Sequence, residues 1–180
     1  MIEREGMKKT IWFVATVVFA GCVSAAWAEP YAEVASLPPK NSEFYGLWEM
    51  TLSEIQVPER ASVTVPPYPG ARIVSVMKAG DPDVSGPRAT PKIVLLSVDG
   101  RKEIATFYRK ALPGWKQGSD QQADFFWTDS ETFAIGPIAY KNTPSVIIQD
   151  IKGMGPMDIM EKSLMPQART RITVIYKVGK

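Results

Sequence analysis

The clearest pattern of apolar and polar positions lies between residues 98 and 115. Apolar side chains recur three, four, seven and eight positions after Ile104, which is the spacing of one face of an α-helix. Asp99 is placed to cap the first turn, and Pro113 ends the helical run. We therefore predict one long amphipathic helix over about residues 100–112. Its apolar face consists of Ile104, Phe107, Tyr108, Ala111 and Leu112.

Runs of β-branched and aromatic residues predict strands on both sides of this helix. They cover residues 72–78, 92–98, 122–128, 145–151 and 170–177, with a weaker run at 132–140. The expected order is β-β-α-β-β-(β)-β, with the first two strands antiparallel. The simplest fold is α+β: an antiparallel sheet of five or six strands packed against one main helix. A short second helix is expected at 157–164, after Pro156.

The first 28 residues have the layout of a secretory signal peptide. Two lysines, Lys8 and Lys9, precede an apolar run, and Ala26-Trp27-Ala28 fits the rule for cleavage after small residues. The acidic residues before Lys8 are unusual in such a segment, so Met7 is an alternative start to Met1. We expect export, most simply to the periplasm.

Cys22 leaves a second route open. The sequence Phe19-Ala20-Gly21-Cys22 resembles a bacterial lipobox, in which the cysteine is lipidated and becomes the mature N-terminus. Phe19 departs from the usual leucine of that motif. Cleavage after Ala28 and lipidation at Cys22 are therefore both retained, and the second would anchor the protein to the envelope by a lipid.

The remainder is divided into two parts. Residues 29–65 are expected to form an N-terminal arm or packing segment, and residues 66–180 a single α+β domain. The arm contains the aromatic-rich segment 42–53, which either packs onto the core or serves as a docking peptide for a partner.

Composition narrows the chemistry. The chain has 180 residues, a net charge of +2, no histidine and one cysteine. The balanced charge argues against a nucleic-acid partner. The absence of histidine removes the commonest general base and the commonest metal ligand. We predict no catalytic residue and no cofactor.

One combination of residues resembles a known pattern. Tyr68-Pro69-Gly70-Ala71, then Phe107-Tyr108, Leu112 and Gly114-Trp115, is similar to the YPGA…FY…L…GW signature of a small α+β domain in uncharacterised bacterial secreted proteins and lipoproteins. The resemblance covers about residues 68–127. It implies a fold and an envelope location, and it implies no activity and no site residue.

Four aromatic residues are candidates for a ligand cleft: Tyr108, Trp115, Trp127 and Phe125. Aromatic side chains commonly line binding sites for lipids, glycans or peptides. More often, residues of this kind fill the core between helix and sheet, and this is the interpretation we favour. The positive residues of the predicted helix, Arg101, Lys102, Arg109 and Lys110, are interpreted as its solvated face.

Two alternative chemistries remain. Met154, Met157 and Met160, with Met165 nearby, offer thioether ligands for Cu(I) or Ag(I), although methionine also fills irregular gaps in cores. Asp124, Asp129 and Glu131 offer carboxylates for a hydrolase, although turn capping explains them as well. The leading hypothesis is a non-enzymatic envelope domain that binds a protein, peptide or amphipathic ligand, with membrane contact only through the signal peptide or a lipid on Cys22.

Overall fold

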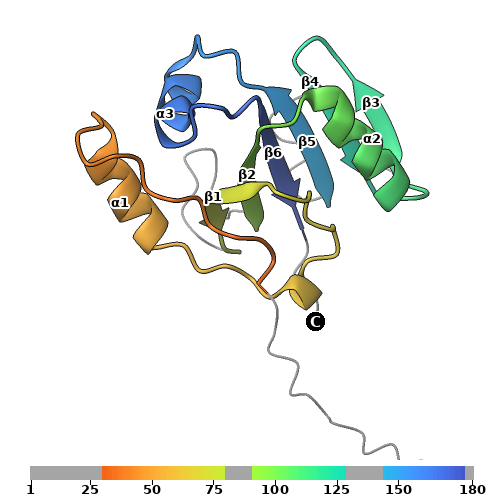
Figure 1. Cartoon of the computed structure of the whole chain (residues 1–180). Coiled ribbons are helices and arrows are strands. Elements are labelled where there is room, and N and C mark those ends of the chain that lie inside the picture. The colour runs from red at the N-terminus through yellow and green to blue at the C-terminus, as the bar shows by residue number, and fades with distance from the viewer. Residues whose placement is uncertain (1–29, 80–90, 129–143, 177–180) are drawn as a thin grey trace, which may run out of the picture.

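The computed structural model describes residues 30–79, 91–128 and 144–176, and its centre is a six-stranded antiparallel sheet (Figure 1). The strands are β1 (Arg72–Met77), β2 (Lys92–Ser97), β3 (Lys116–Ser119), β4 (Ala123–Trp127), β5 (Ser145–Asp150) and β6 (Thr170–Ile175). Their order across the sheet is β1-β2-β6-β5-β4-β3, and every neighbouring pair is antiparallel. The predicted α+β class and the six-strand sheet are confirmed.

The long amphipathic helix is α2, Arg101–Ala111, and it packs on one face of this sheet. Ile104 and Tyr108 are fully buried there, and Leu112 is nearly so. They contact alternate residues of the strands, such as Ile148 and Ile172, because alternate side chains point to the same face of a sheet. The helix therefore buries the side that its periodicity predicts.

Two shorter helices cover part of the opposite face. These are α1 (Tyr45–Ser53) and α3 (Pro156–Leu164), which lie across the sheet from α2 (Figure 1). Trp48 of α1 is buried, and its indole N–H donates to the carbonyl of Met160 at 3.2 Å and to the Ser163 hydroxyl at 3.1 Å. The aromatic-rich segment thus packs on the core through this tryptophan, and the predicted helix after Pro156 is confirmed.

The N-terminal arm packs against both faces of the sheet. Tyr31, Val63 and Val65 are buried on the α2 side, where the single-turn 3₁₀ helix η1 (Arg60–Ser62) leads into an extended stretch. The arm also runs beside β1, because the Ile73 N–H donates to the Glu33 carbonyl and the Ala35 N–H donates to the Ile73 carbonyl, each at 2.8 Å.

Three details differ from the sequence predictions or lie beyond them. Gly100, not Asp99, is the residue before α2, and Asp99 instead accepts a hydrogen bond from the Tyr68 hydroxyl at 2.8 Å. The sequence does not predict strand β3, because its residues Lys-Gln-Gly-Ser include no apolar side chain; its backbone pairs with β4. The weaker run at 132–140 lies outside the described residues.

Candidate functional site

A cavity of about 620 Å³ opens at the N-terminal end of α2. Four separate parts of the chain form its wall: the first turn of α2, the β3–β4 hairpin, the end of β5 and the residue before β6. The lining residues are Gly100, Arg101, Lys102, Glu103, Ser119, Asp124, Asp150, Ile151 and Arg169. Six of these nine residues are charged, so the cavity suits a small polar ligand better than an apolar one.

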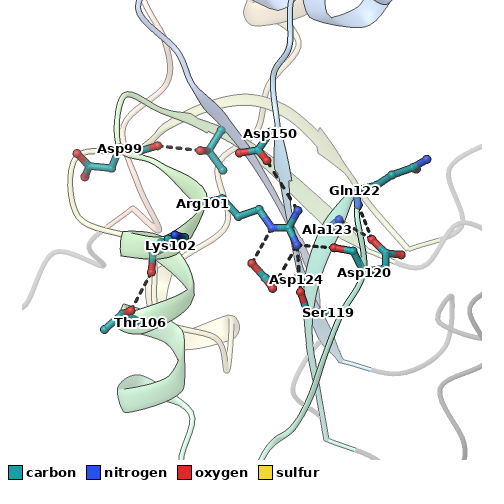
Figure 2. Close-up of polar contacts among 11 residues, drawn as sticks. Asp99, Arg101, Lys102, Thr106, Ser119, Asp120, Gln122, Ala123, Asp124 and Asp150 are labelled. Atoms are coloured by element: carbon teal, nitrogen blue, oxygen red, sulfur yellow. Dashed lines mark hydrogen bonds and ion pairs between the residues drawn. The ribbon is translucent and has the colours of Figure 1, made fainter.

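Arg101 holds this end of α2 to the sheet (Figure 2). Its Nε donates to Asp124 Oδ2 at 2.7 Å, and its Nη2 donates to the Ser119 hydroxyl at 3.1 Å and to the Asp120 carbonyl at 2.8 Å. Asp150, at the end of β5, lies 3.7 Å from Nη1. One guanidinium thus ties together α2, the β3–β4 hairpin and β5. The expectation that Arg101 lies on a solvated helix face is wrong, since its side chain is only 15% exposed.

The ion pair shifts both of its members toward the charged form. Hydrogen bonding to Asp124 raises the pKa of Arg101. Partial burial raises the pKa of Asp124, but hydrogen bonds from Arg101 and Ser119 outweigh burial, and the net pKa of this carboxyl is lowered. Asp124 is therefore a structural anion at neutral pH and is poorly suited to donate a proton.

Three other charged side chains of the cavity have no hydrogen-bond or ion-pair partner among the residues that the structure describes. They are Lys102, Glu103 and Arg169. Glu103 and Arg169 converge on Gly100: a Cβ at position 100 would lie 2.6 Å from Glu103 Oε2 and 3.4 Å from Arg169 Nη2. Glycine at this position therefore leaves room for both side chains at the mouth of the cavity.

The four aromatic candidates do not share one surface. Tyr108 is completely buried beneath α2, with Trp115 packed against the same cluster. Phe125 belongs to a small cluster on the opposite face of the sheet, and Trp127, two residues along the same strand, points to that face as well. None of the four lines the cavity described above.

The residues of the YPGA…FY…L…GW pattern have structural roles. Tyr68 to Ala71 forms a turn, with Gly70 at φ +76° and the Ala71 N–H donating to the Tyr68 carbonyl at 3.2 Å. A second turn of the same kind follows α2, where Gly114 has φ +83°. The Tyr68 ring packs edge-on against Phe107 with 5.2 Å between centroids. The pattern thus encodes two proline–glycine turns and the aromatic packing between them.

The methionine candidates are spread between surface and core. Met154 and Met157 are exposed, at 81% and 55%, whereas Met160 packs partly buried against the Trp48 cluster. Met165 also packs against that cluster. Core packing therefore accounts for Met160 and Met165. Within the described residues, no contact brings Met154 or Met157 next to them.

Of the remaining candidate residues, only Asp124 is among those that the structure describes. Of the three carboxylates, Asp124 lies in the ion pair with Arg101, and Asp129 and Glu131 lie outside the described residues, as does Cys22. Within residues 30–79, 91–128 and 144–176, no group of three or more cysteine, aspartate or glutamate side chains is arranged to hold a metal ion. No helix in these ranges is long and apolar enough to cross a bilayer.

Comparison with protein-family models, with curated proteins and with solved structures found no match for this chain. The resemblance to secreted and lipoprotein domains therefore stays a prediction that rests on the residues quoted above.

Sequence reasoning missed the cavity because its residues come from four distant segments. Arg169 stands alone between two elements, and Lys102 and Glu103 look like ordinary surface residues of a helix. A weak signal was available in Gly100, since glycine directly before a helix leaves the first turn open to a nearby group.

Proposed function

We propose that this chain is an exported envelope protein whose folded part is a non-enzymatic domain that binds a small, negatively charged ligand at the N-terminal end of α2. The supporting observation is the pair of cations at the cavity, Lys102 and Arg169, which have no partner in the described part of the chain. A guanidinium and an ammonium that converge on one cavity favour an anionic group such as a carboxylate or phosphate.

The other charges of the cavity limit what fits there. The charge of Arg101 is already neutralised by Asp124. Arg101 therefore holds the wall of the cavity in place and adds little attraction for an anionic ligand. Glu103 lies close to Arg169 and would repel a bulky anion. A compact ligand, with one anionic end against Arg169 and a polar or cationic remainder near Glu103, satisfies both constraints.

A non-enzymatic role is supported by the chemistry of the chain. There is no histidine, and the least exposed carboxylate of the cavity lining, Asp124, is held ionised by Arg101. Export is supported by the signal-peptide pattern of residues 1–28. Cleavage after Ala28 and lipidation at Cys22 remain the two routes to the mature protein.

Thermal unfolding in the presence of defined anions tests the binding proposal. Inorganic phosphate, citrate and glutamate are each added to the purified protein, with sodium chloride at matched ionic strength as the reference. A ligand at a hundredfold excess over its Kd stabilises the folded state by about 2.7 kcal/mol, which raises Tm by several degrees.

A charge-matched pair of variants makes this test specific. Lys102→Gln with Arg169→Gln removes the two cations of the cavity, and we expect it to abolish the rise in Tm. Lys40→Gln with Lys110→Gln removes the same charge from exposed positions elsewhere and should leave the rise intact. No rise with any of the three anions, or an equal rise in both double variants, contradicts the proposal.

Mass spectrometry of the mature N-terminus tests the export proposal separately. Expression of the full chain in a bacterium should give envelope protein that starts at Glu29, or a lipid-modified chain that starts at Cys22. Protein that retains Met1 or Met7 in the cytoplasm contradicts export.

A further inference from the structure

The two outer strands of the sheet, β1 and β3, differ in whether another segment of the chain hydrogen-bonds to their outer side. Beside β1, the arm hydrogen-bonds to both the N–H and the carbonyl of Ile73 and so covers that edge at this one residue. At the other end, β3 pairs with β4 and with no other strand of the described chain. An uncovered edge strand offers its backbone groups to another chain.

The register of the β3–β4 hairpin shows which backbone groups of β3 point outward. The Asp120 N–H donates to the Ala123 carbonyl at 2.9 Å, so this pair of residues is hydrogen-bonded. Bonded and non-bonded pairs alternate along an antiparallel ladder. Gly118 is therefore also bonded to β4, whereas the N–H and carbonyl groups of Gln117 and Ser119 point away from it. No hydrogen bond to these outward backbone groups occurs among the residues that the structure describes.

We propose that β3 pairs antiparallel with β3 of a second copy of this chain, with the two-fold axis at Gly118. In this register, Gln117 of each copy lies opposite Ser119 of the other, and both residues present their outward backbone groups to each other. The four outward N–H and carbonyl groups of each copy are then all paired, and the two sheets become one continuous sheet.

Charge complementarity selects this register. With Gly118 on the axis, Lys116 of each copy lies directly opposite Asp120 of the other, at the separation of about 5 Å that is usual for facing Cβ atoms. Lys116 is exposed and has no side-chain partner in the described chain. The Asp120 carboxylate accepts from the turn amides of Gln122 and Ala123, and in the described chain no side chain donates to it. A slip of two residues in either direction breaks both ion pairs.

Apolar contact is available at the axis as well. The ring of Trp127 lies over Gly118, with two ring carbons 3.4 Å from where a Cβ would be. The indole of this β4 residue therefore lies over the middle of β3. When two glycines face each other on the axis, the two Trp127 rings approach above them and shield the pairing from water.

Sedimentation velocity of the purified protein over a range of concentrations tests the proposal. We expect a reversible monomer–dimer equilibrium that weakens as salt is added, because the two ion pairs are exposed. A protein that remains monomeric at every concentration overturns it.

Two variants with matched controls locate the interface. Gln117→Pro removes an outward N–H without touching a bond to β4, and proline is tolerated on an edge strand, so the monomer should fold normally. The dimer loses two hydrogen bonds, and Kd should rise by about tenfold or more. Gln117→Ala removes the same side chain, including its contact with Arg109, but keeps the N–H and should dimerise as the parent does.

Lys116→Glu places like charges opposite each other at both ends of the pairing, and Kd should rise several-fold, most strongly at low salt. Lys110→Glu makes the same charge change on the exposed side of α2 and should leave Kd unchanged. A dimer that survives both Gln117→Pro and Lys116→Glu forms through another surface, and the proposal is then wrong. Circular dichroism and Tm of each variant confirm that the monomer remains folded.

Discussion

Two arginines anchor helices to opposite faces of the sheet, in opposite ways. Arg101 lies on α2 and reaches down to carboxylates of the strands, whereas Arg171 lies on the central strand β6 and reaches up to Asp158 and Glu161 of α3. The two side chains are about equally buried, at 15% and 17% exposed. The carboxylates differ: Glu161 is 2% exposed, but Asp124 is 20% and Asp150 is 43% exposed.

The ion pair of Arg171 is therefore closed to solvent, whereas that of Arg101 is open to solvent on its carboxylate side. Arg171 meets Glu161 through two bonds of 2.5 Å and Asp158 through one of 3.0 Å. Asp158 also accepts from the N–H groups of Lys152 and Gly153, so the whole cluster is satisfied internally. Around Arg101, by contrast, a cavity remains with Lys102, Glu103 and Arg169 unpaired in the described chain. The closed cluster accounts for stability, and the open one leaves room for a ligand.

The largest effect is expected from Arg171→Met. The change leaves the buried Glu161 carboxylate without its counter-charge, and breaking such a pair costs about 3–5 kcal/mol. Urea unfolding followed by tryptophan fluorescence measures the loss. Adding Glu161→Leu to Arg171→Met should recover part of it, because the stranded charge is removed. A loss no larger than that of Arg101→Met would show that the two clusters do not differ as described.

A smaller effect is expected from Arg101→Met, about 1–3 kcal/mol. Its bonds to Asp124, Ser119 and the Asp120 carbonyl are lost, but Asp124 can be hydrated through the cavity. The same unfolding measurement applies, with Lys110→Met as a control on the exposed side of the same helix. Unchanged stability would mean that the pair contributes nothing to holding α2 on the sheet.

The tyrosine before the first proline–glycine turn should have a modest effect. Tyr68→Phe removes the bond to Asp99 and should cost about 0.5–1.5 kcal/mol at neutral pH. Burial, followed by the hydrogen bond to Asp99, raises the pKa of Tyr68 to about 12. Because the folded pKa lies above the unfolded value near 10, this contribution is complete below about pH 10 and is lost as pH rises toward 12. The stability difference between parent and Tyr68→Phe should therefore shrink over that range in urea titrations.

The smallest effect is expected in acid, at Asp124. Its folded pKa is lowered, so its contribution is present above the unfolded pKa of about 3.9 and is lost as pH falls through the folded value. The stability gap between parent and Asp124→Asn should be constant near neutral pH and close below about pH 4. A gap at Asp124 that does not change with pH would rule out the ion pair as its cause.

Local pattern was sufficient to predict much of the fold. The spacing of Ile104, Tyr108 and Leu112 determined which side of α2 is buried. The alternation in residues 170–177 predicts that Ile172 and Val174 share one face of a strand, and both lie in the buried cluster that contains Ile104 and Tyr108. Both predictions succeed because helix and strand periodicity are properties of the backbone itself.

The candidate site was much harder to predict from the same residues. Aromatic residues suggested a cleft, yet Tyr108 fills the core and the cavity is charged. Arg101 looked like part of a solvated face, because helical position alone does not reveal that the β3–β4 hairpin folds over it. Strand β3 carries no apolar pattern, so only its pairing with β4 identifies it.

The sequence by itself determined α2, α3 and five of the six strands, the buried face of α2 and the two proline–glycine turns, because each depends on residues close together in the chain. The expectation of export rests on local sequence in the same way. Only the tertiary structure decided that the last strand, β6, lies between β2 and β5 at the centre of the sheet. That placement brings Arg171 beneath α3 and Arg169 to the end of α2. Contacts between distant residues follow from how whole elements pack, and no local periodicity contains them.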